Sequence, residues 1–482
     1  MIISNARTCI IATLGPASSD SGTIATLIDA GVNVFRINFS HGAHSDHVRI
    51  VEIIREQSTS TMRPIGIMQD LQGPKIRVAR FLKDRIELVS GAEFSLTCDD
   101  DSPGDQHRVG VSYPGLCQDL SPGDRLLLDD GRLALEVNRI SNKTIETRVV
   151  VGGTLSNNKG INIPGCDLGI PALSEKDIDD MRVGAELDVD WVAMSFVRSR
   201  DDVEHARKHL QGFGSRAKLM SKIEKPSAVE RFEGILEASD GIMVARGDLG
   251  VELSPEQVPL VQKRLIDICR EVGKPVVTAT QMMESMISSA TPSRAEASDV
   301  ANAIFDGTDA VMLSAETAIG EYPVEAVSMM NQIAMSVEAD ENYHRTMADK
   351  MVHSRRNVAD SVANAACQMA NEIDATVIVT FSSSGATALR VARHRISKYV
   401  LALTPNELAY RQLAMSWGID AILAAEITSS TEMIAEANHW ILKTGVAEPG
   451  DLFVITAGMP FGVTGTTNLI RAETVQEPQV VP

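Results

Sequence analysis

The chain has 482 residues, a formal net charge of −19 and only 4% aromatic residues. At about 150 residues per domain, this length predicts two to four domains with room for a large core. The acidic excess argues against nucleic acid or an anionic membrane as a partner, so any phosphate must be held by local groups.

The cysteines and the N-terminus indicate a compartment. The six cysteines are scattered without a Cys-x-x-Cys pair, which predicts a reducing cytoplasm and neither a disulfide framework nor a zinc site. The first residues contain no basic segment leading into an apolar one, and no apolar run reaches about 18 residues. We therefore expect a soluble, unprocessed cytoplasmic protein.

Short apolar runs rich in Val and Ile alternate with helical stretches along most of the chain. One stretch, 254–272, has Pro255 just inside its start and Gly273 just past its end. Another opens with a capping box at Ser293 and ends at Gly307. Eight strand-then-helix units predict an α/β fold, a (β/α)₈ TIM barrel with its chemistry at the carboxyl ends of the strands. The runs are 8–14, 32–39, 65–70, 191–196, 218–223, 241–244, 276–280 and 310–313.

Between the third and fourth runs the pattern changes to short alternating strands. Asp129, Asp130 and Gly131 separate runs at 125–128 and 132–137, and Asp-Gly is a strong hairpin signal. We expect an inserted β-barrel domain over the barrel mouth, acting as a lid that excludes water. A plain structural insertion is the alternative.

A third pattern begins after residue 352. A helix at 357–372 and a strand at 375–381 precede a Ser/Gly/Thr loop, a helix through Arg395 and a strand at 400–404. Such a loop offers amides and hydroxyls to a phosphate. We expect the barrel at 1–74 and 171–345, the lid at 75–170 and an α/β effector domain at 346–482. The loop residues are Ser382, Ser383, Ser384, Gly385, Ala386 and Thr387.

Two neighbouring runs end in charged residues. Alternate side chains of a strand share a face, so Lys222 should point the same way as Glu224, and Arg246 the same way as Asp248. Two carboxylates with room for substrate oxygens suit Mg²⁺ or Mn²⁺. The alternative is a solvated rim, but facing charges at two strand ends favour the metal site.

Six segments, in order along the chain, resemble the motifs of pyruvate kinases. The resemblance implies transfer of a phosphoryl group from phosphoenolpyruvate to ADP in glycolysis, giving pyruvate and ATP, by a homotetramer. It covers essentially the whole chain. The segments are 35–42 (FRINFSHG), 68–77 (MQDLQGPKIR), 221–225 (SKIEK), 244–250 (VARGDLG), 278–282 (TATQM) and 312–317 (MLSAET).

The same resemblance assigns roles to residues at the strand ends. It implies that Glu224 and Asp248 hold the divalent metal, while Lys222 and Arg36 neutralise the phosphoryl group. The remaining roles are the substrate carboxylate for Ala245, Arg246, Gly247 and Thr280, the nucleotide for Asn38, His41, Arg77 and Lys159, and proton relay for Thr280 and Ser314.

The segment after the third run departs from the commonest family pattern. Well-known members have Glu where this chain has Lys75, and they bind K⁺ among residues equivalent to Asn38, Ser40 and Asp70. A tethered ammonium supplies that charge and repels a second cation. Members with Leu71, Gln72 and Lys75 do not need K⁺, so we expect K⁺ independence. The alternative is that Lys75 points into solvent and K⁺ still binds.

The C-terminal loop indicates regulation. Relatives bind phosphorylated metabolites there, with a second loop matching 458–465. Ser383 stands where many bisphosphate-activated enzymes carry Lys, and the second loop lacks their Trp and Arg. We therefore expect a sugar monophosphate or a nucleotide monophosphate as effector.

Two other functions are open to such a barrel. One is a metal-dependent aldolase or synthase acting on pyruvate or phosphoenolpyruvate, which would need no nucleotide lid with Lys159. The other is a non-catalytic metabolite sensor, which would have lost a metal ligand or Lys222. The chain retains Lys159 in the lid segment, Lys222 and both predicted metal ligands, so the residues favour neither alternative.

Overall fold

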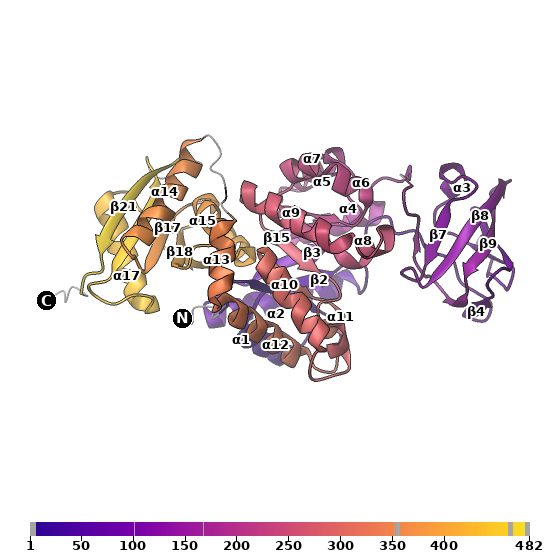
Figure 1. Cartoon of the computed structure of the whole chain (residues 1–482), viewed down its shortest axis with the longest axis horizontal. Helices are drawn as coiled ribbons and strands as arrows, with labels where there is room; N and C mark the ends of the chain where they lie inside the picture. The colour runs from indigo at the N-terminus through magenta and orange to yellow at the C-terminus, as the bar shows by residue number, and fades with distance from the viewer. Residues whose placement is uncertain are drawn as a thin grey trace.

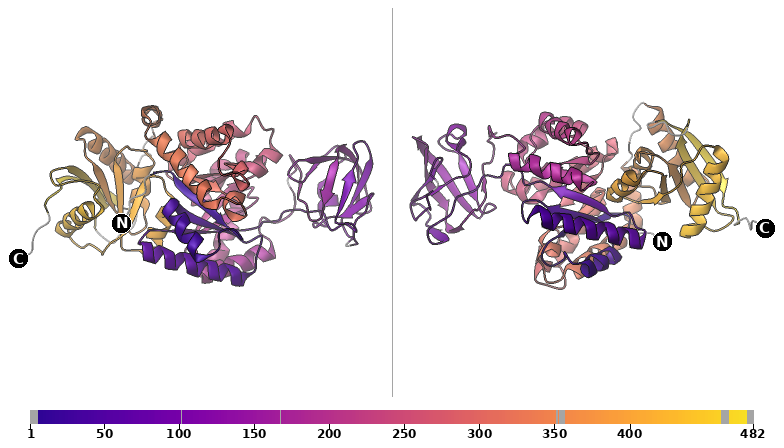
Figure 2. Two further views of the ribbon diagram at one scale, coloured as in Figure 1. Left: turned by 90° about the horizontal axis from the view of Figure 1, so that it is seen from below. Right: turned by 180° about the vertical axis from the view of Figure 1, so that it is seen from behind.

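The computed structural model describes residues 6–100, 102–166, 168–350, 352, 357–460 and 466–477. Three bodies lie in a row along the long axis (Figure 1): the C-terminal α/β domain, the barrel, and the inserted β domain at the far end. The same order is visible from below and from behind (Figure 2). Among the described residues, no helix has the length and apolar character to cross a bilayer.

Eight parallel strands close into a barrel in the order β1-β16-β15-β14-β13-β12-β3-β2, which confirms the predicted fold class. Almost every barrel-strand residue is buried, as expected for parallel strands covered on both faces. The strands are β1 Cys9–Leu14, β2 Val32–Asn38, β3 Gly66–Asp70, β12 Trp191–Met194, β13 Lys218–Ile223, β14 Gly241–Ala245, β15 Val276–Ala279 and β16 Ala310–Leu313.

The ends of the barrel helices agree with the sequence prediction at one helix and differ from it at another. Ser293 accepts a hydrogen bond from the Glu296 N–H, and Gly307 ends that helix with φ 97°, as predicted. The predicted start at residue 254 is wrong, because α8 runs to Glu252 and a turn precedes α9. The helices are α1 Ser21–Ala30, α2 His44–Thr61, α4 Glu175–Glu186, α5 Arg200–Gly212, α6 Pro226–Glu230, α7 Phe232–Ala238, α8 Arg246–Glu252, α9 Val258–Val272, η1 Glu284–Ile287, α10 Arg294–Asp306, α11 Ala315–Ala318, α12 Pro323–Glu338 and α13 Glu341–Asp349.

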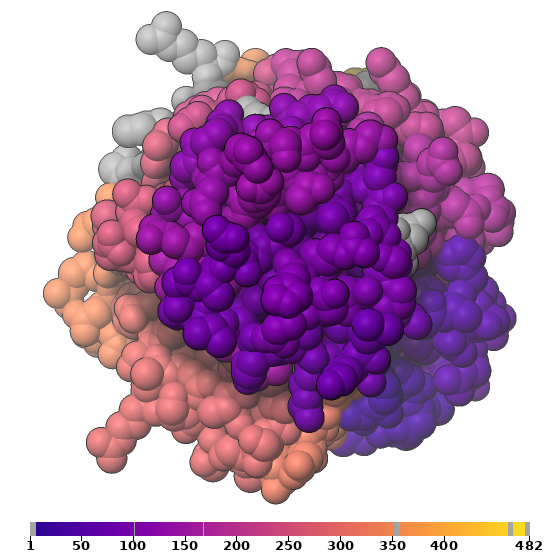
Figure 3. Space-filling model, turned by 90° about the vertical axis from the view of Figure 1, so that its right-hand side faces the viewer, coloured from indigo at the N-terminus to yellow at the C-terminus, as the bar shows by residue number. Residues whose placement is uncertain are grey.

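The insertion folds into two sheets around one apolar core, with strand orders β11-β7-β8-β9-β5-β6 and β10-β4. The predicted hairpin joins β7 to β8, and its turn residues Asp129, Asp130 and Gly131 all have positive φ. The elements are β4 Arg85–Leu88, β5 Glu93–Thr97, β6 Arg108–Gly110, α3 Leu116–Asp119, β7 Arg125–Leu128, β8 Leu133–Ser141, β9 Thr144–Val151, β10 Gly153–Ser156 and β11 Ile161–Asn162. Seen from its own end, this domain lies in front of the barrel (Figure 3).

One cysteine pair contradicts the expectation of no disulfides. Cys98, just after β5, is bonded to Cys117 of α3. The two residues are 19 positions apart and meet because both border the apolar core of the insertion. Such a meeting depends on tertiary packing and leaves no spacing signal in the sequence. Cys9, Cys166, Cys269 and Cys367 are free.

The C-terminal domain has a five-stranded sheet in the order β19-β18-β17-β20-β21. Its second helix is shorter than predicted and ends at Ala392, and Arg395 beyond it has a positive φ of 51°. The second loop of the expected effector site, 458–465, lies mostly outside the described residues. The elements are α14 Val358–Glu372, β17 Val377–Phe381, α15 Ala386–Ala392, β18 Tyr399–Thr404, α16 Glu407–Gln412, η2 Leu413–Met415, β19 Ile419–Leu423, α17 Ser430–Thr444, β20 Leu452–Gly458 and β21 Thr467–Thr474.

This domain packs against the amino-terminal end of the barrel strands. Met415 joins the apolar cluster of the barrel interior, which includes Trp191. Beside it, fully buried Asp190 forms ion pairs with Arg55 of the barrel at 3.0 Å and with Arg411 at 2.7 Å. Breaking a buried pair leaves uncompensated charges, so Asp190 holds the two bodies together.

We predict that Asp190→Ala lowers the free energy of unfolding by roughly 3–5 kcal/mol, because both guanidinium groups lose a buried partner. Asp188→Ala is the control, since the Asp188 side chain also pairs with Arg411 but is 59% exposed. An exposed pair contributes about 1 kcal/mol or less. Urea unfolding measures both variants, and equal losses would contradict the prediction.

Candidate active site

Lys222 of β13 is the centre of a charged cluster at the barrel mouth. Its ammonium lies 3.0 Å from Glu224 Oε1 and 3.3 Å from Asp70 Oδ1, and it donates a hydrogen bond to Ser195 Oγ at 2.7 Å. Burial alone would lower the pKa of Lys222, but the two carboxylates outweigh it and raise that pKa above its ordinary value. The side chain is therefore a fixed cation.

Arg36 of β2 approaches the same carboxylate from the other side. Its Nε donates to Asp70 Oδ2 at 2.5 Å, and its Nη1 donates to Thr13 Oγ1 at 3.0 Å. Burial would raise the pKa of Asp70, yet Arg36 and Lys222 lower it below its ordinary value. Asp70 is thus an anion that orients two cations, which is an arrangement suited to binding phosphate.

Glu224 follows β13 and is almost fully buried. Its Oε2 accepts a hydrogen bond from the Phe196 N–H at 2.7 Å, while Oε1 accepts no well-oriented hydrogen bond from a described residue. Burial raises the pKa of Glu224; Asp248 raises it further, and Lys222 opposes both. A second carboxylate within electrostatic reach, and an oxygen whose one close partner is the Lys222 ammonium at 3.0 Å, fit a divalent cation, which prefers oxygen ligands.

Asp248 and Gly247 lie in the first turn of α8. The Gly247 N–H donates to Thr280 Oγ1 at 2.9 Å, and a Cβ on Gly247 would meet Thr280 atoms at 3.4 Å. Thr280 has φ 68°, which is an outlier for a β-branched residue. Such strain persists only where the surroundings impose it, and it is characteristic of ligand sites.

Arg246 does not share a strand face with Asp248, contrary to the prediction. The reason is that β14 ends at Ala245 and α8 begins at Arg246. The guanidinium turns to Asp299 at 2.7 Å and donates to the Thr280 carbonyl at 2.9 Å. Arg246 therefore supports the strained backbone and does not extend the cluster.

Several predicted residues lie near the cluster without direct contact to Lys222. Asn38 ends β2, and its Oδ1 accepts from the Ser40 N–H at 3.1 Å; exposed His41 follows. Ser314 follows β16, and its N–H donates to Glu316 Oε2 at 2.7 Å. All occupy the carboxyl ends of strands, as expected for a barrel site.

The predicted lid residues engage the lid itself. Lys159 Nζ pairs with Asp129 Oδ1 at 2.6 Å, and Arg77 Nη1 donates to the Asn158 carbonyl at 3.0 Å. Arg77 also forms a β-bridge with Gly160. Both cations sit on the part of the lid that is closest in sequence to its connections with the barrel.

Lys75 lies between Asp248 of α8 and Asp130 of the inserted domain. Its ammonium lies 3.2 Å from Asp248 Oδ1 and 3.7 Å from Asp130 Oδ1, with the side chain 21% exposed. No contact within the described part of the chain joins it to Asn38, Ser40 or Asp70. The buried backbone of Leu71 accepts a hydrogen bond from Ser195 Oγ at 2.8 Å.

Three contact residues were missed by the sequence analysis: Thr13, Ser195 and Phe196. Ser195 accepts the Lys222 hydrogen bond, Phe196 donates to Glu224 with φ 56°, and Thr13 accepts from Arg36. The signal that could have found them is position, because all three lie at the carboxyl end of a barrel strand, where chemistry is expected.

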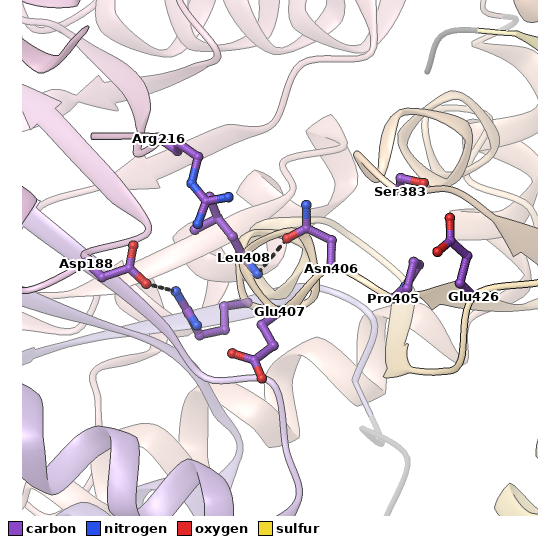
Figure 4. Close-up of a pocket in the computed structure, with 9 residues that line it drawn as sticks. Asp188, Arg216, Ser383, Pro405, Asn406, Glu407, Leu408 and Glu426 are labelled. Atoms are coloured by element: carbon purple, nitrogen blue, oxygen red, sulfur yellow. Dashed lines mark hydrogen bonds and ion pairs between the residues drawn. The ribbon is translucent and has the colours of Figure 1, made fainter. Parts of the chain in front are cut away.

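The predicted effector loop borders the junction between the C-terminal domain and the barrel. Ser383 lines a cavity of about 490 Å³ together with Asn406, Arg216 and Glu426 (Figure 4). Ser383 and exposed Ser384 line a neighbouring cavity of about 410 Å³. The loop is also anchored from within, since the hydroxyls of Thr387 and Thr467 lie 2.8 Å apart.

Comparisons with known proteins identify the family of the chain. The family model described as pyruvate kinase, barrel domain, matches residues 5–327, and that of the pyruvate kinase alpha/beta domain matches 360–472. The pyruvate kinase of Methylorubrum extorquens is 45% identical over 96% of this chain and 96% of its own length. The pyruvate kinases of Mycobacterium intracellulare and Clostridium acetobutylicum are 45% and 40% identical, each over 98% of this chain and 99% and 100% of their own lengths.

The family models together cover most of the sequence, and these relatives align from end to end. Members of this family are phosphotransferases that use phosphoenolpyruvate and ADP with a divalent metal, giving pyruvate and ATP. The chain belongs to the pyruvate kinase family.

Proposed function

We propose that the protein is a Mg²⁺-dependent, K⁺-independent pyruvate kinase whose C-terminal domain binds a phosphorylated effector. The observation that carries the catalytic part is the Lys222 ammonium held between two buried carboxylates, with Arg36 on the far side of one of them. Glu224 and Asp248 would hold Mg²⁺, or Mn²⁺ in its place. A metal bound there offsets negative charge on the phosphoryl and enolate oxygens.

Lys222 and Arg36 stabilise the phosphoryl group during transfer. Charge in such a transition state spreads over three oxygens, so catalysis depends on fixed cations aimed at them. Asp70 orients both side chains before substrate arrives. No reorganisation is then needed when the phosphorus–oxygen bond breaks.

The strained segment beside α8 receives the carboxylate of phosphoenolpyruvate. Backbone amides of Ala245, Arg246 and Gly247, together with the Thr280 hydroxyl, donate hydrogen bonds to it. The Gly247 N–H and Thr280 Oγ1 already face each other at 2.9 Å. Thr280 and Ser314 relay the proton that converts the enolate to pyruvate.

The lid supplies the nucleotide side of the reaction. We assign the lid to residues 75–170, the barrel to 1–74 and 171–345, and the effector domain to 346–482, in a homotetramer. Lys159 and Arg77 from the lid join Asn38 and His41 from the barrel at the phosphates of ADP. Exclusion of water by the lid keeps the phosphoryl group from hydrolysis.

Lys75 replaces the charge of a monovalent cation. Its ammonium is tethered within 3.2 Å of Asp248, so it supplies positive potential at the substrate site without a bound ion. The oxygens of Asp70 are already engaged by Arg36 and Lys222. A K⁺ ion entering the site would be repelled by the fixed charges of Lys75, Arg36 and Lys222.

We predict that Lys222→Met lowers kcat by ~10²-fold or more, because it removes charge stabilisation specific to the transition state. Phosphoenolpyruvate with Mg²⁺ should still bind in calorimetry. Lys218→Met, at the other end of the same strand, is the matched control and should keep its turnover. Full activity of Lys222→Met in a pyruvate-forming assay would remove the proposed role.

We predict that the wild-type enzyme turns over equally in sodium and potassium buffers, and that Lys75→Glu becomes dependent on K⁺ because a negative charge then recruits the ion. Initial rates across a K⁺ titration measure the effect. Lys83→Glu makes the same charge change at an exposed lid position and serves as control. A Lys75→Glu enzyme indifferent to K⁺ would exclude the ammonium argument.

The effector proposal rests on the loop at Ser382–Thr387. Hydroxyls of Ser383 and Ser384 and the Arg216 guanidinium border cavities large enough for a monophosphorylated sugar or nucleotide. Residues on those walls come from both the barrel and the C-terminal domain. A ligand bound there would contact both the barrel and the C-terminal domain, so its binding would depend on how the two domains pack together.

We predict that Ser384→Glu and Ser382→Glu abolish activation by the effector through like-charge repulsion of its phosphate, with basal turnover unchanged. Rates are measured with a panel of sugar and nucleotide monophosphates. Ser430→Glu adds the same charge on an exposed position of α17 and should respond normally. Activation that survives in both loop variants would place the effector elsewhere.

A further inference from the structure

A buried ion pair lies at the base of the lid, apart from the cluster around Lys222. Lys225 Nζ is 3.0 Å from Glu252 Oε1, and the two residues are 8% and 6% exposed. Asn162 of the lid strand β11, 4% exposed, donates from Nδ2 to the same oxygen at 3.1 Å. Three segments therefore meet here: the loop after β13, the end of α8, and the lid.

The hydrogen bonds of this contact are unevenly distributed. Both donors converge on Glu252 Oε1, while Glu252 Oε2 and Asn162 Oδ1 have no hydrogen-bond partner among the described residues. Apolar side chains of similar size commonly pack as stably as a buried ion pair. Removing one partner of an existing pair is costly, however, so Lys225 holds the Glu252 carboxylate in place, and Asn162 joins that carboxylate to the lid.

The contact sits where the lid joins the barrel. A single cavity is lined by Glu252 and Lys225, by Pro74 from the first connection and by Ile170 from the second. Both connections are themselves held to the barrel. The Gly73 N–H donates to Asp177 Oδ1 at 3.0 Å.

Arg198 holds the second connection, donating to the carbonyls of Leu168 at 2.5 Å and Ile170 at 2.7 Å. Two further contacts join the lid to α8: the hydrogen bond from Asn162 to Glu252 at the end of the helix, and the ion pair of Lys75 with Asp248 in its first turn.

Both proposed metal ligands are close to the contact between Asn162 and Glu252. Asp248 is in the first turn of α8 and Glu252 is its last residue, so the two lie four residues, or roughly 6 Å, apart along the helix axis. Lys225 directly follows Glu224 in sequence. Lys159, proposed for the nucleotide, lies three residues before Asn162. A small displacement of α8 therefore reaches the lid through the Asn162 hydrogen bond at one end of the helix and through the Lys75 ion pair at the other.

We infer that Glu252 is a positioning residue that couples the phosphoenolpyruvate end of the active site to the lid, through Asn162. Binding at Gly247 and Asp248 shifts α8, Glu252 carries Asn162 with it, and the lid brings Lys159 toward the nucleotide. Each substrate then tightens the binding of the other by the same factor. This inference rests on the proposed roles of Asp248 and Gly247.

The test measures coupling in the full-length enzyme, with Mg²⁺ and oxalate as a two-carboxylate mimic of the enolate. Calorimetry gives the Kd of ADP with and without saturating oxalate. We expect oxalate to tighten ADP binding at least about fivefold in the wild type, the lower end of usual coupling. In Asn162→Ala, which leaves Lys225 paired with Glu252 and Lys75 paired with Asp248, the ratio should fall below that of the wild type while oxalate binds as before.

The outcomes separate the inference from the proposed function. Failure of oxalate to bind the wild type with Mg²⁺ would refute the proposed substrate site. Binding of both ligands without coupling, or full coupling in Asn162→Ala, would overturn the inference alone.

Two further variants distinguish coupling from misfolding. Asn162→Asp places two carboxylates face to face and should weaken coupling, whereas Asn162→Asp combined with Glu252→Gln restores one donor and one acceptor and should recover it. Failure of the double variant to exceed the single one would assign the loss to repacking and overturn the inference. Glu256→Gln, an exposed acid just beyond α8, should couple like the wild type.

Discussion

Burial of the Lys222 ammonium dictates much of the barrel mouth. An ammonium removed from water is tolerated only when carboxylates compensate for the lost hydration, and Asp70 and Glu224 do so. Asp70 is itself buried and forms an ion pair with Arg36, which in turn donates a hydrogen bond to Thr13. These charged and polar contacts link β13 to β3, β3 to β2, and β2 to β1. A rim built in this way is rigid before any substrate binds, which is the condition for electrostatic catalysis.

The opposite end of the barrel uses carboxylates to hold the C-terminal domain. Asp309, just before β16, pairs with Arg395 at 3.1 Å and accepts from the Trp417 N–H at 3.2 Å, while Asp190 precedes β12 and receives Arg411. The barrel thus has a catalytic rim at one end and a docking rim at the other. Ser383 lines a cavity at the docking rim, so a ligand bound there, as proposed, would lie across the barrel from the catalytic rim.

The sequence predicted the barrel well because apolar runs separated by capped helices leave few other folds. It predicted that Lys222 and Glu224 meet because the alternation of β13 continues for one residue beyond the end of the strand. It failed where the chain leaves a strand. Arg246 was misplaced since helix geometry begins one residue after β14 ends. Ser195 went unnoticed because a serine at a strand end has no distinctive spacing. The partner of Lys75 was not foreseen, since a long side chain at the lid junction takes its direction from tertiary packing.

The contribution of Met415 to the barrel interior has a consequence for the order of synthesis. The layer that it completes contains Cys9 and Ile11 from the first strand and Met312 from the last. A ribosome therefore releases all eight strands long before it releases the residue that seals their lower end. Until then the nascent barrel exposes an apolar opening, so its final packing is delayed until translation reaches the C-terminal domain.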